Sequence, residues 1–218
     1  FGKSWDLHVT AVLKTTLDEN IEMIKDTIRY MKANNKKVVY DAEHFFDGYA
    51  ANEEYALKTL QAAAEAGADW LVLCDTNGGT MPYDTESVVR KVTDSFKMPV
   101  GIHSHNDCGL AVANSVIAVE NGAVMVQGTI NGYGERCGNA DLTSIIPLIQ
   151  LKLKRNCIPE ENMSKVTPVA RYISEIANMA HNEKAPFVGN SSFAHKGGMH
   201  IDAVSKDPKT FEHIEPAR

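Results

Sequence analysis

The sequence predicts an α/β protein built around a parallel β-sheet. Short β-branched, apolar runs alternate with amphipathic stretches of helical length through about the first 150 residues. The connections between these segments are short, and a parallel pair of strands needs a crossover helix to return the chain. The residue pattern alone leaves two arrangements open, a doubly wound open sheet and a closed barrel.

Five segments have the composition of strands. Each is rich in Val, Ile, Leu or an aromatic residue and is bounded by polar or turn-forming residues. We expect strands at Leu7–Val12, Lys37–Glu43, Trp70–Asp75, Val100–His105 and Val124–Ile130.

The helices between them carry recognisable start and stop signals. Thr16 and Glu19 form a capping box, which predicts a helix from there to about Ala33. Asn52 can cap a helix that ends at Gly67, and Gly122 ends a later helix in the same way. The segments that lead into Gly67 and Gly122 form a weak internal repeat, each with a glycine cap immediately before a strand.

The pattern changes after Cys157. Residues 158–162 read as a linker, and a helix is expected from Thr167 to about Ala180, followed by a polar, glycine-containing tail. We therefore expect one domain over residues 1–157 and an appended helical subdomain over residues 158–218.

Composition limits the class of protein. The chain has 218 residues, 44% of them hydrophobic, and 22 Lys+Arg against 28 Asp+Glu give a net charge of −6. This balance argues against nucleic acid as the main partner, and no apolar run is long enough for a membrane span. With no secretion signal and four dispersed cysteines, we expect reduced thiols and a cytoplasmic location.

The most informative cluster lies at the end of the fourth expected strand. His103 and His105 are two residues apart, so strand alternation places both side chains on one face, followed by Asn106 and Asp107. Two imidazoles in this arrangement can share a metal ion. The alternative is a hydrogen-bonded histidine pair without metal.

Two other expected strands end in polar residues. Glu43 shares a face with Val39 and Asp41, and its carboxylate could act as a base or bind a substrate hydroxyl. Thr76 could donate a hydrogen bond to a substrate carboxylate. The alternatives are a solvated loop carboxylate for Glu43 and a turn cap for Thr76.

Two further segments are candidates for function. Residues 131–139 form a glycine-rich loop between a strand and a helix, which could present backbone amides to an anion. In the tail, His195 and His200 flank Gly197-Gly198 and precede Asp202. We interpret this segment as a loop with acid-base histidines, because a loop is a poor place for core histidines.

In this order, the segments resemble the Claisen-condensing acyltransferases of the DRE-TIM metallolyase superfamily, the isopropylmalate, homocitrate and citramalate synthases. The resemblance spans essentially the whole chain and is strongest to the citramalate synthase branch. The motifs that carry it are Glu43, Asp75-Thr76, His103-Ser104-His105-Asn106-Asp107, Gly134-Glu135-Arg136-Cys137-Gly138-Asn139 and His200-Ile201-Asp202.

The resemblance implies a (β/α)8 TIM barrel. The five expected strands would correspond to its fourth to eighth strands, with a C-terminal helical linker subdomain after them. No segment of this sequence matches the first three strands, the first of which carries an Asp metal ligand and an adjacent Arg in the family. The metal site is therefore expected to be incomplete within this chain.

The resemblance also implies roles for individual residues. His103 and His105 would bind Mg, Mn or Zn, with Asn139 as a nearby contact, while Thr76 and Asn106 would bind the 2-oxo acid. Glu43 and His200 would handle protons. Acetyl-CoA would contact Gly134, Glu135, Arg136 and Asn139.

In the family, the His200 segment reaches the partner's barrel in a homodimer, so we expect a homodimer here. The expected reaction joins acetyl-CoA to pyruvate to form citramalate, a step of branched-chain amino-acid biosynthesis, with isopropylmalate or homocitrate synthesis as alternatives. Two other classes stay open. One is a lyase or carboxyltransferase with the same His-x-His strand, and the other is a non-catalytic half-barrel module.

Overall fold

The computed structural model describes residues 1–216, which fall into two compact units. The first unit contains Phe1–Gly128 and Gly134–Ala140, and the second contains Thr129–Tyr133 and the chain from Asp141 onward. The predicted boundary near residue 157 lies inside the second unit and stays a prediction about domain organisation.

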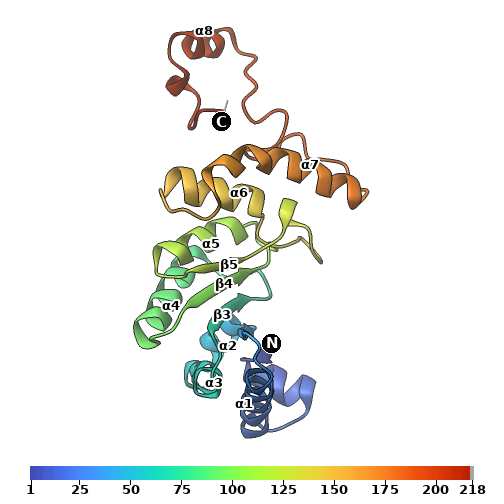
Figure 1. Cartoon of the computed structure of the whole chain (residues 1–218), viewed down its shortest axis with the longest axis vertical. Helices are drawn as coiled ribbons and strands as arrows, with labels where there is room; N and C mark the ends of the chain where they lie inside the picture. The colour runs from blue at the N-terminus through green and yellow to red at the C-terminus, as the bar shows by residue number, and fades with distance from the viewer. Residues whose placement is uncertain (217–218) are drawn as a thin grey trace. The chain divides into compact units, whose positions relative to one another are not determined.

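The first unit is built on one parallel sheet of five strands (Figure 1). The strands pair in chain order, β1-β2-β3-β4-β5, and every pairing is parallel. Their bounds are β1 Gly2–Lys3, β2 Val39–Glu43, β3 Trp70–Asp75, β4 Val100–Ser104 and β5 Met125–Gln127.

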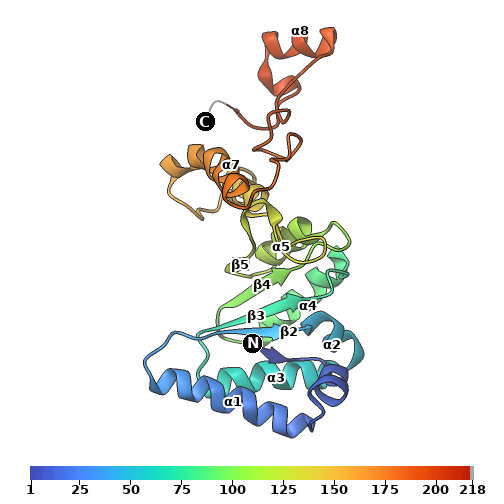
Figure 2. The ribbon, with the colours of Figure 1, turned by 90° about the vertical axis from the view of Figure 1, so that its right-hand side faces the viewer.

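The strand order decides between the two arrangements that the sequence left open. In a doubly wound sheet the strand order reverses at a switch point, so that helices cover both faces. Here the order never reverses, and right-handed crossovers then place all the helices on one face, as in a barrel. Figure 2 shows the helices of this unit on one side of the sheet. The chain thus has the predicted α/β fold, with five βα units of a partial barrel.

The helices of the first unit include the two whose bounds the sequence predicted, near residues 16–33 and 52–67, and the one predicted to end at Gly122. The helices of this unit are α1 Leu17–Ala33, α2 Phe45–Ala51, α3 Glu53–Ala66, α4 Pro82–Ser95 and α5 Ala111–Glu120. The Thr16 hydroxyl accepts a hydrogen bond from the Glu19 amide at 3.1 Å, and the Asn52 side chain caps α3 through the Tyr55 amide at 3.1 Å. Gly67 closes α3 with a φ of 98°, a left-handed conformation that glycine adopts without strain.

The core lies between this sheet and its helices. Leu71, Leu73 and Ile102 are fully buried there, in contact with residues of α1, α3 and α4. Burying a side chain of this size contributes about 1.5–3 kcal/mol to folding. Successive side chains of a strand point to opposite faces of the sheet. The residues next to these three in the strands therefore lie on the face that the helices do not cover.

One predicted strand is wrong. Leu7–Val12 does not form a strand, because β1 lies earlier, at Gly2–Lys3, and residues His8–Leu13 form a short π-helix. Only Val9 is buried in this segment, while Leu7 and Val12 are exposed, so its apolar residues do not form a strand face. The Trp5 carbonyl accepts the His8 and Val9 amides and starts the helical turn.

The other strand ends also differ in detail. The expected strands at Lys37–Glu43, Val100–His105 and Val124–Ile130 are each present but shorter, and Trp70–Asp75 matches the structure residue for residue. The fifth strand stops at Gln127, because the chain then turns through an irregular segment in which Asn131 has a φ of 63°.

The second unit contains α6 Leu142–Pro147, α7 Val166–Ile176 and α8 Gly198–Lys206, together with short helical turns. It includes Asn131, whose side-chain amide donates to the Ala170 carbonyl at 2.8 Å, and Tyr133, whose hydroxyl lies 3.0 Å from the Ser174 hydroxyl. The expected helix from Thr167 to Ala180 corresponds to α7, which ends four residues earlier. Among the described residues, no helix is both long and apolar enough to cross a membrane.

Candidate functional site

Polar side chains gather on the sheet face that the helices leave open. Tyr40 and Ala42 of β2 and Ile102 of β4 belong to the helix-covered core, so the residues that alternate with them face the opposite side. This open face carries a set of ionisable or amide side chains, one or more from every strand: Lys3, Asp41, Glu43, Cys74, His103 and Gln127.

The two histidines of the predicted metal site converge. The Nε2 atoms of His103 and His105 lie 3.2 Å apart, and their ring centroids are 5.0 Å apart. Two nitrogens bound to one metal ion at about 2.1 Å each would have a similar separation. The structure therefore brings the two ring nitrogens together, and their role as metal ligands stays a prediction.

The surroundings of His105 keep its ring neutral. Burial, followed by the charge of His103, lowers the pKa of His105 below its ordinary value. A neutral imidazole has the lone pair that a metal ligand needs. Its Nδ1 atom is buried with no hydrogen-bond partner among the described residues, so this side of the ring is not held by the protein.

Residues present in this chain fit part of a divalent-metal site. The imidazole pair supplies two nitrogen ligands, but the described residues contain no group of three or more His, Cys, Asp or Glu side chains that could hold an ion. Asn139 lies beside the pair, since its backbone forms a bridge with His105. Its role as a metal contact stays a prediction.

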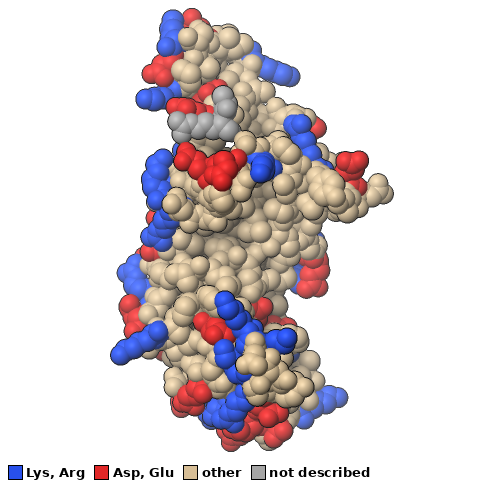
Figure 3. Space-filling view, viewed as in Figure 1, with Lys and Arg blue, Asp and Glu red and all other residues tan. Residues whose placement is uncertain are grey.

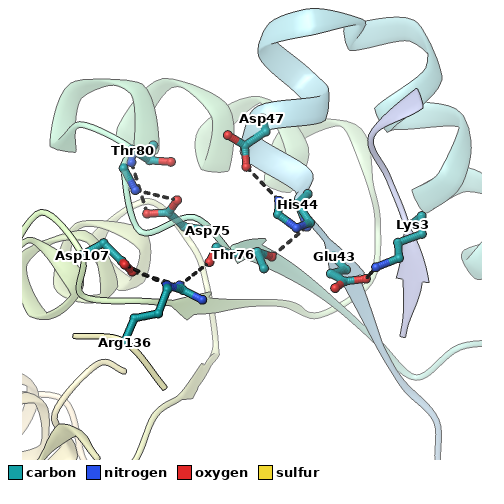
Figure 4. Close-up of polar contacts among 10 residues, drawn as sticks. Lys3, Glu43, His44, Asp47, Asp75, Thr76, Thr80, Asp107 and Arg136 are labelled. Atoms are coloured by element: carbon teal, nitrogen blue, oxygen red, sulfur yellow. Dashed lines mark hydrogen bonds and ion pairs between the residues drawn. The ribbon is translucent and has the colours of Figure 1, made fainter. Parts of the chain in front are cut away.

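Glu43, the candidate base, is paired with a cation. Lys3 of β1 and Glu43 of β2 are register partners, and their side chains form an ion pair (Figure 4). The Glu43 side chain is about one quarter exposed. The role of Glu43 as a base stays a prediction.

The Thr76 hydroxyl is held in place by the backbone of the neighbouring strand end. The His44 amide donates to Thr76 Oγ1 at 2.8 Å, and the hydroxyl keeps its own proton to donate to another group (Figure 4). His44 has a φ of 57°, a conformation uncommon for a residue with a side chain. Its ring is tilted against the ring of His8, with the centroids 4.0 Å apart, and its Nδ1 atom lies 3.2 Å from Asp47 Oδ2.

Asp75, directly before Thr76, shapes the loop that follows β3. Its carboxylate accepts the Gly79 and Thr80 amides, each at 3.3 Å, so it closes the turn after the strand. Burial raises the pKa of Asp75, although these hydrogen bonds oppose the shift. The side chain that the sequence grouped with Thr76 therefore acts on the loop rather than on the open face.

Arg136 joins three loops at the carboxyl ends of the strands. Its Nε and Nη2 atoms donate to the two carboxylate oxygens of Asp107 at 2.8 and 2.9 Å, and Nη2 also donates to the Thr76 carbonyl at 2.8 Å (Figure 4). This pairing holds the pKa of Asp107 below its usual range. The sequence predicted acetyl-CoA contact for Arg136, and the structure adds a role in fixing the loops.

Other predicted residues have local partners. The Asn106 side chain accepts the Ala111 amide at 3.2 Å and so caps the start of α5. A Cβ atom at Gly134 would collide with the Asn139 side chain, so a glycine is needed at that position. Glu135 lies 3.4 Å from Arg136 and is exposed. Substrate or acetyl-CoA contact by these residues stays a prediction.

His200 belongs to the second unit, whose position relative to the strand ends is not described. The residue lies in the first turn of α8, so the predicted loop around it is helical from Gly198 onward. Its ring stacks on Phe211 at 4.2 Å with an interplanar angle of 26°. His195 lies 3.7 Å from Glu212, and Asp202 pairs with Lys206 at 2.6 Å. The proton-transfer role of His200 stays a prediction.

Two residues of the site were missed by reasoning from the sequence. Gln127 lies 2.9 Å from His103 Nδ1, and His44 positions Thr76. Alternation in β5 would have placed Gln127 on the open face, but its partner is 24 residues away. No local signal marked His44, because its contact with Thr76 joins the ends of two strands.

The fold and the site define an α/β protein that carries a converging histidine pair at the carboxyl ends of parallel strands. A family model described as HMGL-like matches residues 1–173, and a second, described as homocitrate synthase post-HMGL domain-like, matches residues 187–218. The chain belongs to the HMGL-like family, which confirms the superfamily predicted from the sequence.

The chain is similar to enzymes and a solved structure from several organisms. An (R)-citramalate synthase from Synechocystis sp. is 57% identical over 99% of this chain and 41% of its own length. A homocitrate synthase from Methanopyrus kandleri is 35% identical over 97% of this chain and 52% of its own length. This chain thus spans about two fifths of the length of the citramalate synthase.

Among solved structures, HMG-CoA lyase from Bacillus subtilis matches with a TM-score of 0.71 at 21% identity. The match covers 83% of this chain and 63% of the lyase. At this identity the likeness concerns the fold alone, and it agrees with the partial barrel described above.

The face drawn in Figure 3 has no large patch of one charge, because Lys and Arg side chains are interspersed with Asp and Glu. Ion pairs among the described residues include Lys58 with Asp18 at 3.0 Å and Arg90 with Glu86 at 2.5 Å.

Proposed function

We propose that the protein to which this chain belongs is an acyltransferase that condenses acetyl-CoA with pyruvate to form citramalate. The observation that carries the proposal is the convergent His103 and His105 pair, 3.2 Å apart at the strand ends, in a chain 57% identical to a citramalate synthase. The lower identity of 35% to a homocitrate synthase favours pyruvate over a larger 2-oxo acid.

A divalent metal ion, held by His103 and His105 with Asn139 close by, would supply Lewis-acid polarisation of the 2-oxo group. The identity of this metal, Mg, Mn or Zn, is open, because imidazole and oxygen ligands suit several dications. The third ligand that the resemblance implies, an aspartate, has no counterpart among the residues of this chain.

Thr76 would hold the 2-oxo acid. Its Oγ1 atom accepts the His44 amide, so the hydroxyl proton is directed elsewhere and can be donated to a substrate carboxylate. Asn106, in the loop between β4 and α5, would be the second contact of this acid.

The proton chemistry would use Glu43 and His200. Removal of a methyl proton from acetyl-CoA gives an enolate, whose carbon attacks the ketone carbon of the 2-oxo acid and forms the new C–C bond. The resulting alkoxide takes up a proton, and water then hydrolyses the thioester and releases the CoA thiol. Glu43 is the candidate base for the first step, and its contact with Lys3 holds its carboxylate at the end of β2.

Residues Gly134 to Asn139 are the proposed acetyl-CoA contacts. Arg136 is exposed and fixed by Asp107, so the loop has a defined backbone against which a ligand can bind. We also propose a homodimer in which His200 approaches the partner's strand ends, because this residue lies in the second unit and is exposed there.

The test is metal-dependent thiol release by the intact protein from acetyl-CoA in the presence of Mn²⁺. Pyruvate, 2-oxoisovalerate and 2-oxoglutarate are compared as substrates, with the His103→Ala protein as the matched control. Preference for pyruvate supports citramalate synthesis. Preference for either larger acid moves the protein to isopropylmalate or homocitrate synthesis.

The second candidate class is a lyase or carboxyltransferase, which the fold likeness to HMG-CoA lyase keeps open. Such an enzyme would cleave or transfer without net release of CoA on addition of a 2-oxo acid. Absence of thiol release with all three acids would contradict the acyltransferase. It would favour a lyase or carboxyltransferase, or a non-catalytic half-barrel.

A further inference from the structure

Gln127 connects one histidine of the candidate metal site to a carboxylate on a distant strand. Its Oε1 atom lies 2.9 Å from His103 Nδ1, and its Nε2 atom donates to Asp41 Oδ1 at 2.8 Å. The three side chains come from β5, β4 and β2 and are all partly buried. They form one continuous chain of hydrogen bonds that ends at the Nε2 atom of His103, facing His105.

The contact between Gln127 and Asp41 requires a curved sheet. Strands β2 and β5 are separated by β3 and β4, so they would lie about 14 Å apart in a flat sheet, at about 4.8 Å per strand. Side chains on a flat sheet stand parallel to one another and would not meet over that span. They meet here because the open face is concave, as the inside of a barrel is.

The carboxylate fixes the orientation of the amide. The NH2 group of Gln127 donates to the carboxylate oxygen of Asp41, which leaves the carbonyl end of the amide pointing the other way. The carbonyl oxygen of Gln127 then faces His103, and an oxygen without a proton can only accept. The proton of a neutral His103 ring is consequently on Nδ1, and the lone pair is on Nε2.

The partner on the other ring nitrogen of a histidine commonly sets which nitrogen binds metal. In this structure the contact with Gln127 leaves the lone pair on His103 Nε2. This is the same atom that faces His105 Nε2 at 3.2 Å, where a shared metal ion would bind. His105 has no such partner, since its Nδ1 is buried without a hydrogen bond among the described residues. Of the two rings, it is therefore His103 whose orientation is fixed by a hydrogen bond at Nδ1.

We propose that Gln127, held by Asp41, is a positioning residue that fixes His103 in the Nδ1-protonated form and directs its Nε2 atom at the metal. The proposal rests on the proposed function, because it is the metal of that function which His103 would bind. It adds a residue of β5 and a residue of β2 to a site that the motifs place on β4.

The first measurement is made on the metal-free intact protein. Selective ¹⁵N labelling of histidine gives separate nitrogen shifts for the protonated and unprotonated ring positions, and the His103→Ala protein assigns the His103 signals. We expect the Nδ1-protonated form in the wild type and in Gln127→Glu, which keeps an acceptor oxygen. We expect Gln127→Leu, which has none, to lose that preference.

The second measurement is the affinity for Mn²⁺, followed by the electron paramagnetic resonance signal of the free ion. Gln127→Leu is expected to bind Mn²⁺ about 10- to 100-fold more weakly than the wild type, the range found when such outer partners are removed. The matched control is Gln61→Leu on the exposed surface of α3, where the side chain pairs with Glu65, and its Mn²⁺ affinity should not change.

An Nε2-protonated His103 in the metal-free wild type would overturn the proposal, as would unchanged Mn²⁺ affinity in a folded Gln127→Leu protein. If that variant does not fold, the tautomers of the wild type and of Gln127→Glu decide the matter, since both are expected to carry the proton on Nδ1. Neither readout uses turnover. Failure of thiol release with intact tautomer and Mn²⁺ results would therefore reject the proposed reaction and leave the positioning role in place.

Discussion

The guanidinium of Arg136 donates hydrogen bonds to both carboxylate oxygens of Asp107, at 2.8 and 2.9 Å, and to the carbonyl of Thr76 at 2.8 Å. One side chain thus joins the loop after β5 to the loops after β4 and β3. The planar fork of arginine makes this geometry, which a lysine ammonium cannot reproduce. The positions of the candidate substrate and acetyl-CoA residues consequently depend on one another.

Replacement of Arg136 by lysine should impair turnover more than folding. We expect Arg136→Lys to lower kcat/KM about 10- to 100-fold, because small displacements of positioning loops have effects of this size. The thermal midpoint should hardly change, since the pair is partly exposed. Steady-state kinetics check this, with Arg90→Lys on exposed α4 as the control. A rise in KM for acetyl-CoA alone would instead indicate direct contact with that substrate.

The hydroxyl of Thr76 should matter for the 2-oxo acid in particular. Thr76→Val removes both the acceptor for the His44 amide and the donor for a substrate carboxylate. A hydrogen bond to a charged group contributes about 1.5–3 kcal/mol, so KM for the 2-oxo acid should rise about 10- to 100-fold. Thr76→Ser keeps the hydroxyl and should stay near the wild type. Equal KM values for the valine variant and the wild type would exclude this role.

Much of the sheet and part of the site could be predicted from local pattern. Trp70–Asp75 matches β3 in full, and alternation placed His103 and His105 on one face, where their Nε2 atoms meet. Periodicity succeeds at such positions, because burial of one face of a strand fixes the direction of every alternate side chain.

What could not be predicted depends on contacts between distant segments. Leu7–Val12 has the composition of a strand, but the sheet takes Gly2–Lys3 instead, as their partners are Ala42 and Glu43. Gln127 meets Asp41 across 86 residues of sequence, and Arg136 meets Thr76 across 60. Only the curvature of the sheet and the course of the loops create these pairs.

A glycine in α2 should be indispensable for folding. Gly48 lies against the backbone of Ser4 and Trp5, and a Cβ atom there would collide with the Ser4 carbonyl. Gly48→Ala should therefore destabilise the intact protein by about 1–3 kcal/mol or more, as overpacking of a core does. Thermal unfolding measures the effect. Gly79→Ala is the matched control, because a Cβ atom at Gly79 meets nothing within 4 Å. Equal midpoints for the two variants would contradict this account.

Lowering the pH should weaken the hydrogen bonds that Asp69 accepts from Lys32 and Val38. Asp69 accepts two hydrogen bonds from Lys32, both at 2.9 Å, and one from the Val38 amide at 2.7 Å. The Lys32 bonds above all lower the pKa of Asp69 below its ordinary value. The unfolded chain then binds the proton more readily, so the stabilisation is present above pH 3.8 and is lost as the pH falls through the lower, folded-state pKa.

The corresponding variant is Asp69→Asn. Its thermal midpoint should lie below that of the wild type at neutral pH, and the difference should narrow only once the pH falls below about 4. Asp94→Asn on the exposed surface of α4 serves as the control for loss of one carboxylate. A difference that grows as the pH falls would contradict the assigned sign.

The three histidines of the proposed mechanism should separate into two classes. His103→Ala and His105→Ala each remove a nitrogen from the convergent pair, so both should abolish turnover and weaken Mn²⁺ binding in the intact protein. His200→Ala should lower kcat and leave Mn²⁺ affinity unchanged, because His200 stacks on Phe211 in the second unit and has a proposed role in proton transfer alone. Metal titration beside thiol release distinguishes the classes. If both strand variants kept the Mn²⁺ affinity of the wild type, the ligand assignment would fail, and the pair would have to be interpreted as a hydrogen-bonded element of the open face.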